Sequence, residues 1–496
     1  EKRGIAPEVP IWDHDLCIQC GKCVLVCPHA AIRAKLAAHD QALDLESVPA
    51  KWRGAEELRY VLRVSYEDCT GCTLCREVCP AVSKTQPDHR ALDMVPTAEV
   101  GAEVRRGWET FLSIPDTPEI ATPLKYNNVK NIQLLRPLFE FSGACSGCGE
   151  TPYLKLLSQL FGERALVANA TGCSSIFGGN LPTTPWTKNA QGRGPAWSNS
   201  LFEDNAEFGL GMRIACDTQK RRAQQLVQKL AMALEEDLVE AFVGDNPVPE
   251  PEVQRKMVDL LKVSLRKMDS PDARALLEVA DSLVDRSVWL VGGDGWAYDI
   301  GFGGLDHVLH SGLNVNVLVM DTEVYSNTGG QASKSTSRGA IAAFATGGKS
   351  RPKKELGRIA IGYGNVYVAQ VAMGASDAQL VKAYLEAESF PGPSLILAYS
   401  HCIAHGIEMG HGLDQQSRAV ETGYWPLYRF DPRRALDGEN PMQIDSKPPS
   451  RPLEDYLFQE DRYARLHRQN PAAAHEMLRL MREDVEARWK ALTSMA

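Results

Sequence analysis

Residues 288–331 read VWLVGGDGWAYDIGFGGLDHVLHSGLNVNVLVMDTEVYSNTGGQ, and this stretch decides the fold of the largest domain. Two short apolar runs, residues 288–291 and 315–320, flank a glycine-rich segment that predicts a helix from residue 296 to about residue 310. This order predicts a βαβ unit, whose parallel strands end at the same edge of a sheet. Asp294 and Thr322 each follow one of these strands. We therefore expect their oxygen atoms to converge and to suit a hard cation such as Mg²⁺.

A Gly-Asp-Gly turn at residues 293–295 follows the first of these strands. Its glycines let the backbone approach a diphosphate closely, and the helix start at Trp296 presents free N–H groups to it. Taken alone, such a sequence is usually only a turn. Here a polar loop containing Asn327 follows the second strand, at residues 322–330. The spacing of turn and loop resembles the thiamine diphosphate motif, and this context favours a cofactor site over a simple turn.

The overall composition is that of an ordinary soluble globular protein, with 44% hydrophobic and 24% charged residues among 496. This length allows roughly two to four domains. No apolar run is long enough to cross a bilayer, and the N-terminus lacks the pattern of a signal peptide. The formal net charge of −9, without a basic tract, argues against nucleic acid binding. Because Glu1 is no initiator residue, we expect a subunit or the C-terminal portion of a longer polypeptide.

Thirteen cysteines in a chain without a secretion signal indicate metal or redox chemistry rather than disulfides. The first run, Cys17-x2-Cys20-x2-Cys23-x3-Cys27-Pro28, recurs as Cys69-x2-Cys72-x2-Cys75-x3-Cys79-Pro80. In such runs three thiolates hold one cubane, and the fourth, before proline, reaches the other cluster. The spacing therefore predicts one [4Fe–4S] cluster on Cys17, Cys20, Cys23 and Cys79, and another on Cys27, Cys69, Cys72 and Cys75.

Zinc is the usual alternative for CxxC pairs, but zinc sites use two such pairs rather than a doubled run ending in Cys-Pro. Residues 1–80 thus resemble a bacterial two-cluster ferredoxin. One departure is the long insert at residues 28–68 between the two runs, which leaves both cysteine loops intact.

A third group of cysteines is spread over the rest of the chain. Cys145-x2-Cys148 lies in a glycine-rich loop, Cys173 follows a predicted strand at 165–169, and Cys402 follows another at 394–399. Its position after a strand places Cys402 on the sheet edge that carries Asp294 and Thr322. We predict a third cubane here, with zinc or free thiols as alternatives. Cys216, in a helical stretch, is expected to be a buried thiol.

The motifs at 145–150 (CSGCGE), 170–175 (ATGCSS), 292–301 (GGDGWAYDIG) and 325–331 (YSNTGGQ) look like those of pyruvate:ferredoxin oxidoreductase. The resemblance covers essentially the whole chain and matches the C-terminal part of the single-chain enzyme. It implies an α/β fold, a parallel-sheet thiamine-diphosphate-binding domain preceded by an α+β two-cluster ferredoxin-like domain. The implied boundaries are residues 1–125 for the ferredoxin-like domain and linker, 126–432 for the thiamine diphosphate and Mg²⁺ domain with a helical insertion, and 433–496 for a helical extension.

The resemblance also implies roles for matching residues. Asp294, Thr322 and the backbone carbonyl of Val324 would bind Mg²⁺, although Thr322 stands where many thiamine enzymes have Asn. Asn327 would also lie near the substrate and act in catalysis. The cluster on Cys145, Cys148, Cys173 and Cys402 would be the one proximal to thiamine diphosphate. The cofactor would be lined by Glu150, Cys173, Gly293, Gly295, Trp296 and Asn327.

The implied activity is oxidative decarboxylation of pyruvate with coenzyme A to acetyl-CoA and CO₂, reversible as pyruvate synthase. Electrons would pass through three [4Fe–4S] clusters to ferredoxin or flavodoxin. In the family, the glutamate that tunes the aminopyrimidine lies in the N-terminal part, and no segment here resembles that domain. We therefore expect an N-terminal half or partner subunit to complete the site, a dimer of the complete unit, and a cytoplasmic location.

Two alternatives to this function remain. One is the same chemistry on another 2-oxo acid such as 2-oxoglutarate. The other is a non-catalytic polyferredoxin whose second domain is a relic. The presence together of Asp294, Thr322 and Asn327 favours the catalytic interpretation.

Overall fold

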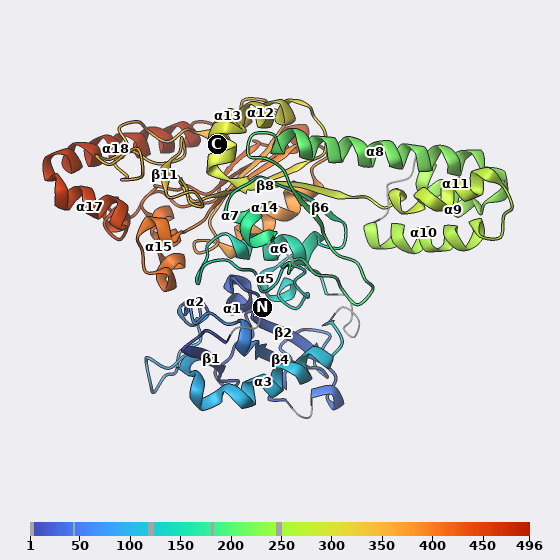
Figure 1. Ribbon diagram of the computed structural model, residues 1–496, viewed down its shortest axis with the longest axis horizontal. Coiled ribbons are helices and arrows are strands. Elements are labelled where there is room, and N and C mark those ends of the chain that lie inside the picture. The colour runs from blue at the N-terminus through green and yellow to red at the C-terminus, as the bar shows by residue number, and fades with distance from the viewer. Residues whose placement is uncertain (1–3, 43–44, 118–123, 180–182, 245–249) are drawn as a thin grey trace.

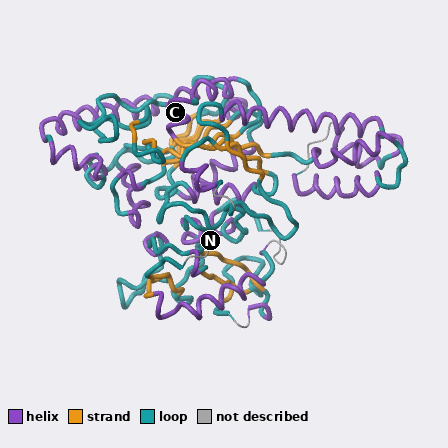
Figure 2. Tube along the Cα trace, in the orientation of Figure 1, coloured by secondary structure: helices purple, strands orange, loops and turns teal. Residues whose placement is uncertain are grey.

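The computed structural model describes residues 4–42, 45–117, 124–179, 183–244 and 250–496. An N-terminal lobe lies below a larger α/β body in Figure 1, with a helical arm projecting from one side of the body and the C-terminal helices on the other. Strands are concentrated in the middle of the body and in the lobe (Figure 2). Among the described residues, no helix combines the length and apolar character needed to cross a membrane.

The N-terminal lobe is built from short elements around the cysteine loops. Two short helices each contain the third cysteine of a run, α1 (Lys22–Val26) and α2 (Leu74–Glu77). Two small antiparallel sheets and one longer helix surround them. These elements are β1 (Glu8–Trp12) with β5 (Leu92–Pro96), β2 (Ile32–Ala37) with β4 (Arg59–Val64) and β3 (Val48–Pro49), and α3 (Thr97–Ser113).

An eight-stranded sheet forms the centre of the body, in the order β15-β14-β12-β13-β9-β8-β6-β7. From β12 to β7 all neighbours are parallel, whereas β14 and β15 are antiparallel to theirs. The strands are β6 (Ala165–Asn169), β7 (Ala196–Asn199), β8 (Ser287–Gly293), β9 (Asn316–Asp321), β12 (Tyr367–Val371), β13 (Ser394–Tyr399), β14 (Tyr428–Phe430) and β15 (Met442–Ile444).

Both faces of this sheet are buried. Along β8, Val288 lies in the hydrophobic core that contains helix α12 (Phe302–His310), and the next residue, Trp289, lies in the core that contains α6 (Thr151–Phe161). Successive side chains of a strand point to opposite faces, so a strand covered on both sides reads as one apolar run. The predicted α/β class with a parallel sheet is confirmed.

The arm, residues 205–283, has a hydrophobic core of its own. It comprises α8 (Asn205–Lys229), α9 (Glu236–Val243), α10 (Pro251–Leu265) and α11 (Pro271–Val279). Because α8 begins against the sheet, with Ala206 in the central core, the arm is anchored to the body at one end.

The C-terminal tail, residues 433–496, is expected as a helical extension and also supplies the edge strand β15. Its longer helices are α17 (Asp461–Gln469) and α18 (Pro471–Thr493). Met481 and Val485 of α18 lie in the same core as the central sheet. The tail is therefore an integral part of the body.

Candidate functional site

Four adjacent strands bring the predicted site residues to one edge of the sheet. In the spatial order β13, β9, β8 and β6, the residues that follow the carboxyl ends are Cys402, Thr322, Asp294 and Cys173. Neighbouring strand ends in a parallel sheet are where ligands bind in such folds. The convergence expected from the βαβ pattern is thus present in the structure.

The carboxylate of Asp294 and the hydroxyl of Thr322 are in direct contact. Thr322 Oγ1 lies 3.1 Å from Asp294 Oδ1 and 3.1 Å from the carbonyl oxygen of Val324. Around Mg²⁺, with ligands at about 2.1 Å, oxygens on one edge of the octahedron are about 3.0 Å apart. The Thr322 hydroxyl is therefore spaced from each of the other two oxygen atoms as adjacent ligands of such a cation are.

Asp294 is fully buried, and its other carboxylate oxygen accepts a 2.5 Å hydrogen bond from Ser333 Oγ. Burial raises the pKa of Asp294 well above its ordinary value, and the carboxylate of Asp321 raises it further. A divalent cation would reverse this shift because it favours the charged form. Within the described residues, no three His, Cys, Asp or Glu side chains converge as they would around one metal ion. A cation here would thus rely on one carboxylate, one hydroxyl and one carbonyl.

The glycine turn leads into a π-helical turn, Gly295–Ile300, before α12 begins. The helix expected from residue 296 is therefore split into two parts, and π turns often occur at functional sites. A Cβ at Gly295 would meet the ring of Tyr325 at 2.5 Å, whereas one at Gly293 would meet only a carbonyl oxygen at 3.8 Å. Trp296 is buried beside the turn, and its Nε1 has no hydrogen-bond partner.

The eight lobe cysteines line two cavities in the combination that their spacing predicts. One small pocket is lined by Cys17, Cys20, Cys23 and Cys79. The other is lined by Cys27, Cys69, Cys72 and Cys75. The fourth cysteine of each run therefore crosses to the other group, as in two-cluster ferredoxins. All eight are free thiols, so the donor set fits two cubanes.

The third group also comes together, around Glu150. Burial raises the pKa of Cys402 to about 12, and the charges of Glu150, Cys173 and Cys145 contribute to the shift. Burial raises the pKa of Cys148 as well, with contributions from Glu150 and Cys402. The loop that carries Cys145 and Cys148 meets the Cys402 segment directly, because His401 Nε2 lies 2.9 Å from the Gly147 carbonyl oxygen. The charge effects of Cys145 and Cys148 on Cys173 indicate that Cys173 is close to them. The remaining cysteine, Cys216, is only partly buried on α8, so the expectation of a buried thiol is wrong.

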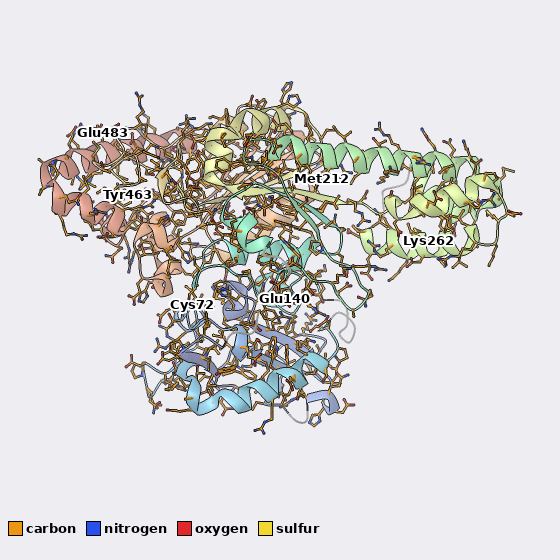
Figure 3. The ribbon with its side chains drawn as sticks, viewed as in Figure 1. Cys72, Glu140, Met212, Lys262, Tyr463 and Glu483 are labelled. Carbon is orange, nitrogen blue, oxygen red and sulfur yellow. The ribbon has the colours of Figure 1, made fainter. Side chains whose placement is uncertain are left out.

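The cysteine groups adjoin one another across the junction of lobe and body. Ser146 Oγ, from the Cys145–Cys148 loop, donates to the carbonyl oxygen of Thr70 at 3.2 Å. Ser146 Oγ also lies 3.2 Å from Thr70 Oγ1, and Figure 3 places Cys72 at this junction. The group of Cys72 in turn adjoins the other lobe group, because Cys23 influences the pKa of Cys75, which burial raises. The three groups thus form a continuous series.

Glu150 and Asn327, two further predicted site residues, differ in burial: Glu150 is buried and Asn327 is exposed. Glu150 is 5% exposed, its Oε2 has no hydrogen-bond partner, and burial raises its pKa to about 8. An orphaned buried carboxyl of this kind fits a site where a bound cofactor supplies the missing partner. Asn327 is exposed, in the loop between β10 (Val324–Tyr325) and β11 (Gln331–Ala332).

Two basic residues pair with the carboxylates on either side of Thr322, and neither was predicted from the sequence. Lys353 contacts both Asp321 and Glu323, at 2.9 and 3.0 Å, and Arg462 contacts Glu323 at 2.8 Å. The acidic residues on either side of Thr322 were the available signal, because charged groups next to a predicted buried strand end need partners.

Two family models match the chain. A "4Fe-4S double cluster binding domain" matches residues 16–82, and a "Thiamine pyrophosphate enzyme, C-terminal TPP binding domain" matches residues 275–398. They cover the two lobe cysteine groups and strands β8, β9, β12 and most of β13, respectively.

Curated relatives match along almost the entire chain. A pyruvate-flavodoxin oxidoreductase of Trichormus variabilis is 53% identical over 99% of this chain and 42% of the relative. A probable pyruvate-flavodoxin oxidoreductase of Escherichia coli is 50% identical over 100% of this chain and 42% of the relative. A pyruvate:ferredoxin oxidoreductase of Moorella thermoacetica is 47% identical over 100% of this chain and 43% of the relative.

The chain spans about two-fifths of the length of these relatives. Along nearly its whole length, it is related to the pyruvate-flavodoxin and pyruvate:ferredoxin oxidoreductases, and it carries their 4Fe-4S double cluster and thiamine pyrophosphate-binding domains.

Proposed function

We propose that this chain is the cluster- and thiamine-binding part of an enzyme that oxidatively decarboxylates pyruvate with coenzyme A to acetyl-CoA and CO₂. The observation that carries the proposal is the shared sheet edge: the third cysteine group and the Asp294 site follow adjacent strands. An electron-transfer protein alone has no use for a buried carboxylate, hydroxyl and carbonyl spaced as magnesium ligands beside its cysteines.

The cofactor site is assigned to residues at the ends of β8 and β9. When bound, thiamine diphosphate supplies the nucleophile for a 2-oxo acid and the ring that accepts electrons as CO₂ leaves. Asp294, the Thr322 hydroxyl and the Val324 carbonyl hold Mg²⁺, and the turn at Gly293 and Gly295 lets the backbone approach the diphosphate.

Other residues position the reacting groups. Glu150, with its pKa raised to about 8, is protonated at neutral pH and can donate a hydrogen bond through its carboxyl group. Asn327 is assigned to the substrate side of the site, and Trp296 and Cys173 line the cofactor.

Three [4Fe–4S] clusters are assigned to the three cysteine groups. Cys145, Cys148, Cys173 and Cys402 hold the cluster beside the thiamine site, and the two lobe groups hold the others. The lobe group of Cys17 lies next to the exposed side chain of Ile18. Electrons can therefore leave the body one at a time and reach the lobe surface, where ferredoxin or flavodoxin would accept them.

The rest of the active site is assigned to an N-terminal half or a partner subunit, with the complete unit forming a dimer. Relatives are more than twice as long as this chain. Asn327 is exposed here, which supports a site that another polypeptide segment closes.

The experiment uses the complete unit, assembled anaerobically from this chain and its complementary half. With thiamine diphosphate, Mg²⁺ and coenzyme A, pyruvate should reduce the clusters, detected by EPR, and yield acetyl-CoA. Asp294→Ala should abolish both while leaving the iron content unchanged. The chain alone should turn over poorly, and full activity without the other half would contradict the proposed division. Reduction by 2-oxoglutarate but not pyruvate would reassign the substrate, and no reduction by any 2-oxo acid would favour the electron-transfer protein.

A further inference from the structure

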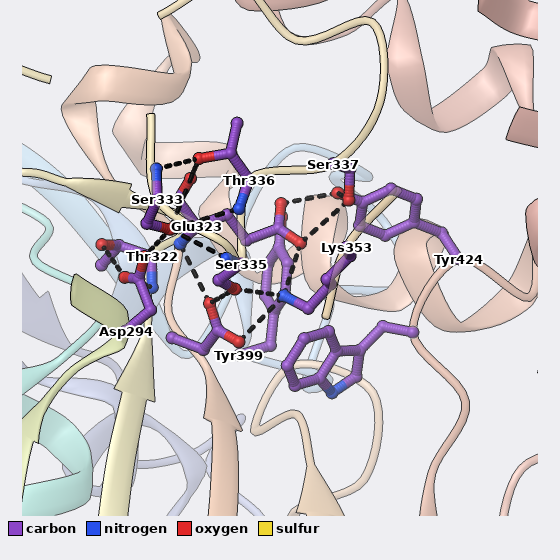
Figure 4. Close-up of polar contacts among 12 residues, drawn as sticks. Asp294, Thr322, Glu323, Ser333, Ser335, Thr336, Ser337, Lys353, Tyr399 and Tyr424 are labelled. Atoms are coloured by element: carbon purple, nitrogen blue, oxygen red, sulfur yellow. Dashed lines mark hydrogen bonds and ion pairs between the residues drawn. The ribbon is translucent and has the colours of Figure 1, made fainter. Parts of the chain in front are cut away.

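Thr322, a proposed metal ligand, lies between two acidic residues, Asp321 and Glu323, and the side chains of both pair with Lys353. Thr322 points its hydroxyl towards Asp294, whereas Glu323 points away from that site (Figure 4). Asp321 pairs with Ser335 and Lys353, and both Asp321 and Glu323 are fully buried. Glu323 also has a φ of +60°, in the left-handed region that side-chain-bearing residues rarely adopt. Contacts behind the loop must therefore hold this conformation.

Lys353 binds both of these carboxylates. Its Nζ lies 2.9 Å from Asp321 Oδ2 and 3.0 Å from Glu323 Oε1, and it donates to Ser335 Oγ at 2.5 Å. The side chain is 8% exposed. One ammonium group thus joins the residues immediately before and after Thr322.

Arg462 reaches the same loop from the C-terminal tail. Its guanidinium lies 2.8 Å from Glu323 Oε2 and 2.5 Å from Glu460 Oε2, and the side chain is 2% exposed. Tyr424 OH donates to the same Glu323 oxygen at 2.6 Å. His405 Nε2 makes a 2.7 Å hydrogen bond to the carbonyl oxygen of Thr322 itself. Through Arg462, the C-terminal tail therefore contacts Glu323 directly, on the side of residues 321–324 that faces away from Asp294.

Stability does not explain this arrangement well. Buried ion pairs lose much of their Coulomb energy to desolvation, and well-packed apolar groups often serve stability equally well. Groups that orient metal ligands, in contrast, commonly control metal affinity. Apart from the Arg462–Glu460 pair, each ion pair described here involves Asp321 or Glu323, the two neighbours of the proposed ligand Thr322.

We propose that Lys353 and Arg462 are positioning residues that hold residues 321–324 in their cation-binding geometry, so that the C-terminal tail sets metal and cofactor affinity from behind the site. This inference rests on the thiamine and Mg²⁺ site of the proposed function. It gives the tail a role in cofactor binding although Arg462 lies on the far side of the loop from Asp294.

Mn²⁺ can replace Mg²⁺ as the probe, with thiamine diphosphate present, and EPR of free Mn²⁺ gives its affinity for the intact chain with reconstituted clusters. Lys353→Met and Arg462→Met should each weaken Mn²⁺ binding by about tenfold or more, because the ligand geometry relaxes. Pure charge repulsion predicts the reverse, since removing a nearby cation strengthens binding of another cation. Unchanged or tighter binding in both variants would therefore overturn the inference.

Matched variants separate positioning from general destabilisation. Lys35 is a buried lysine that pairs with Asp116 at 3.1 Å in the lobe, and Asp484 joins the tail to Arg338 at 2.8 Å without touching Glu323. Lys35→Met and Asp484→Asn should lower the unfolding temperature and leave Mn²⁺ affinity within twofold of wild type. An equal loss of affinity in these controls would also overturn the inference.

Two further measurements complete the design. If Arg462→Met does not fold, a double variant can be used in which Glu323→Gln is combined with Arg462→Met, so that both charges of the pair are removed. Wild-type Mn²⁺ affinity in this double variant would contradict the positioning role. Arg462→Lys keeps a cation and should restore part of the affinity. Failure of the wild-type chain to bind Mn²⁺ with thiamine diphosphate would instead overturn the proposed site itself, and the inference with it.

Discussion

The sulfur of Cys173 and the hydroxyl of Ser326 lie 3.1 Å apart, although 153 residues separate them in the chain. Cys173 belongs to the third cysteine group, and Ser326 belongs to the loop that also contains Asn327. This contact joins the proposed proximal cluster to the proposed thiamine loop. A serine hydroxyl that donates to a cluster sulfur stabilises the reduced, more negative state.

Ser326→Ala should therefore make the midpoint potential of the proximal cluster more negative, as measured by an EPR-monitored redox titration. Ser146→Ala is the matched control, because Ser146 lies between Cys145 and Cys148 but its hydroxyl donates to Thr70. Its potential should stay near that of wild type. A potential unchanged in Ser326→Ala would show that the contact carries no hydrogen bond to the cluster.

Iron analysis can count the clusters. Wild-type chain should contain about twelve iron atoms, in three clusters of four. Cys402→Ala should lose about four of them and one EPR signal, because it removes one ligand of the third group. Cys216→Ala should lose none, since Cys216 lies outside the three groups. Equal iron contents in Cys402→Ala and wild type would exclude Cys402 as a ligand.

Gly295→Ala should weaken thiamine diphosphate binding, measured by calorimetry. The added Cβ would meet the Tyr325 ring at 2.5 Å, so the turn or the loop must move. Overpacking of this kind costs about 1–3 kcal/mol, or roughly fivefold or more in affinity. In Gly303→Ala, on α12, the new Cβ has no atom within 4 Å, so affinity should be unchanged. Similar affinities for the two variants would contradict the tight fit at Gly295.

His89 gives the lobe a pH-dependent contribution to stability. Hydrogen bonds to Asp13, at 2.8 Å, and Asp93, at 2.5 Å, raise the pKa of His89 above its ordinary value. The folded state therefore holds its proton more tightly than the unfolded state, and the stabilisation is complete below about pH 6.5 and is lost as pH rises through the folded pKa. In His89→Gln this part of the pH dependence of thermal unfolding should disappear. If the unfolding temperature varies with pH in the same way in wild type and in His89→Gln, the contribution of His89 is excluded.

Much of the site was predictable because it depends on strand ends. Asp294, Thr322, Cys173 and Cys402 each follow a short apolar run, and parallel strands end at one edge of a sheet, so sequence patterns suffice to bring them together. The crossing of Cys27 and Cys79 between the two lobe groups is likewise contained in the Cys-x2-Cys-x2-Cys-x3-Cys-Pro spacing.

The supporting contacts were not predictable in the same way. Glu323 and Arg462 are 139 residues apart, and no motif links them. Glu323 is fully buried, although a glutamate in a polar loop is normally solvated. Its place beside a predicted strand end indicates that it needs a partner but does not identify Arg462. The strand β15 was missed for a related reason, because three residues at a sheet edge in a proline-rich stretch carry too little periodicity to be recognised.

The junction of lobe and body has a consequence for electron movement. It is fastened by the buried Lys155, which donates to the carbonyl oxygen of Cys27 at 3.2 Å, and by the backbone bond from Phe141 N–H to the His29 carbonyl oxygen at 2.9 Å. Enzymes that shuttle electrons on a swinging domain slow down in viscous solvent, because a rotation precedes each transfer. Here these hydrogen bonds join the lobe directly to the body, so the proposed electron relay should run at the same speed in glycerol as in water.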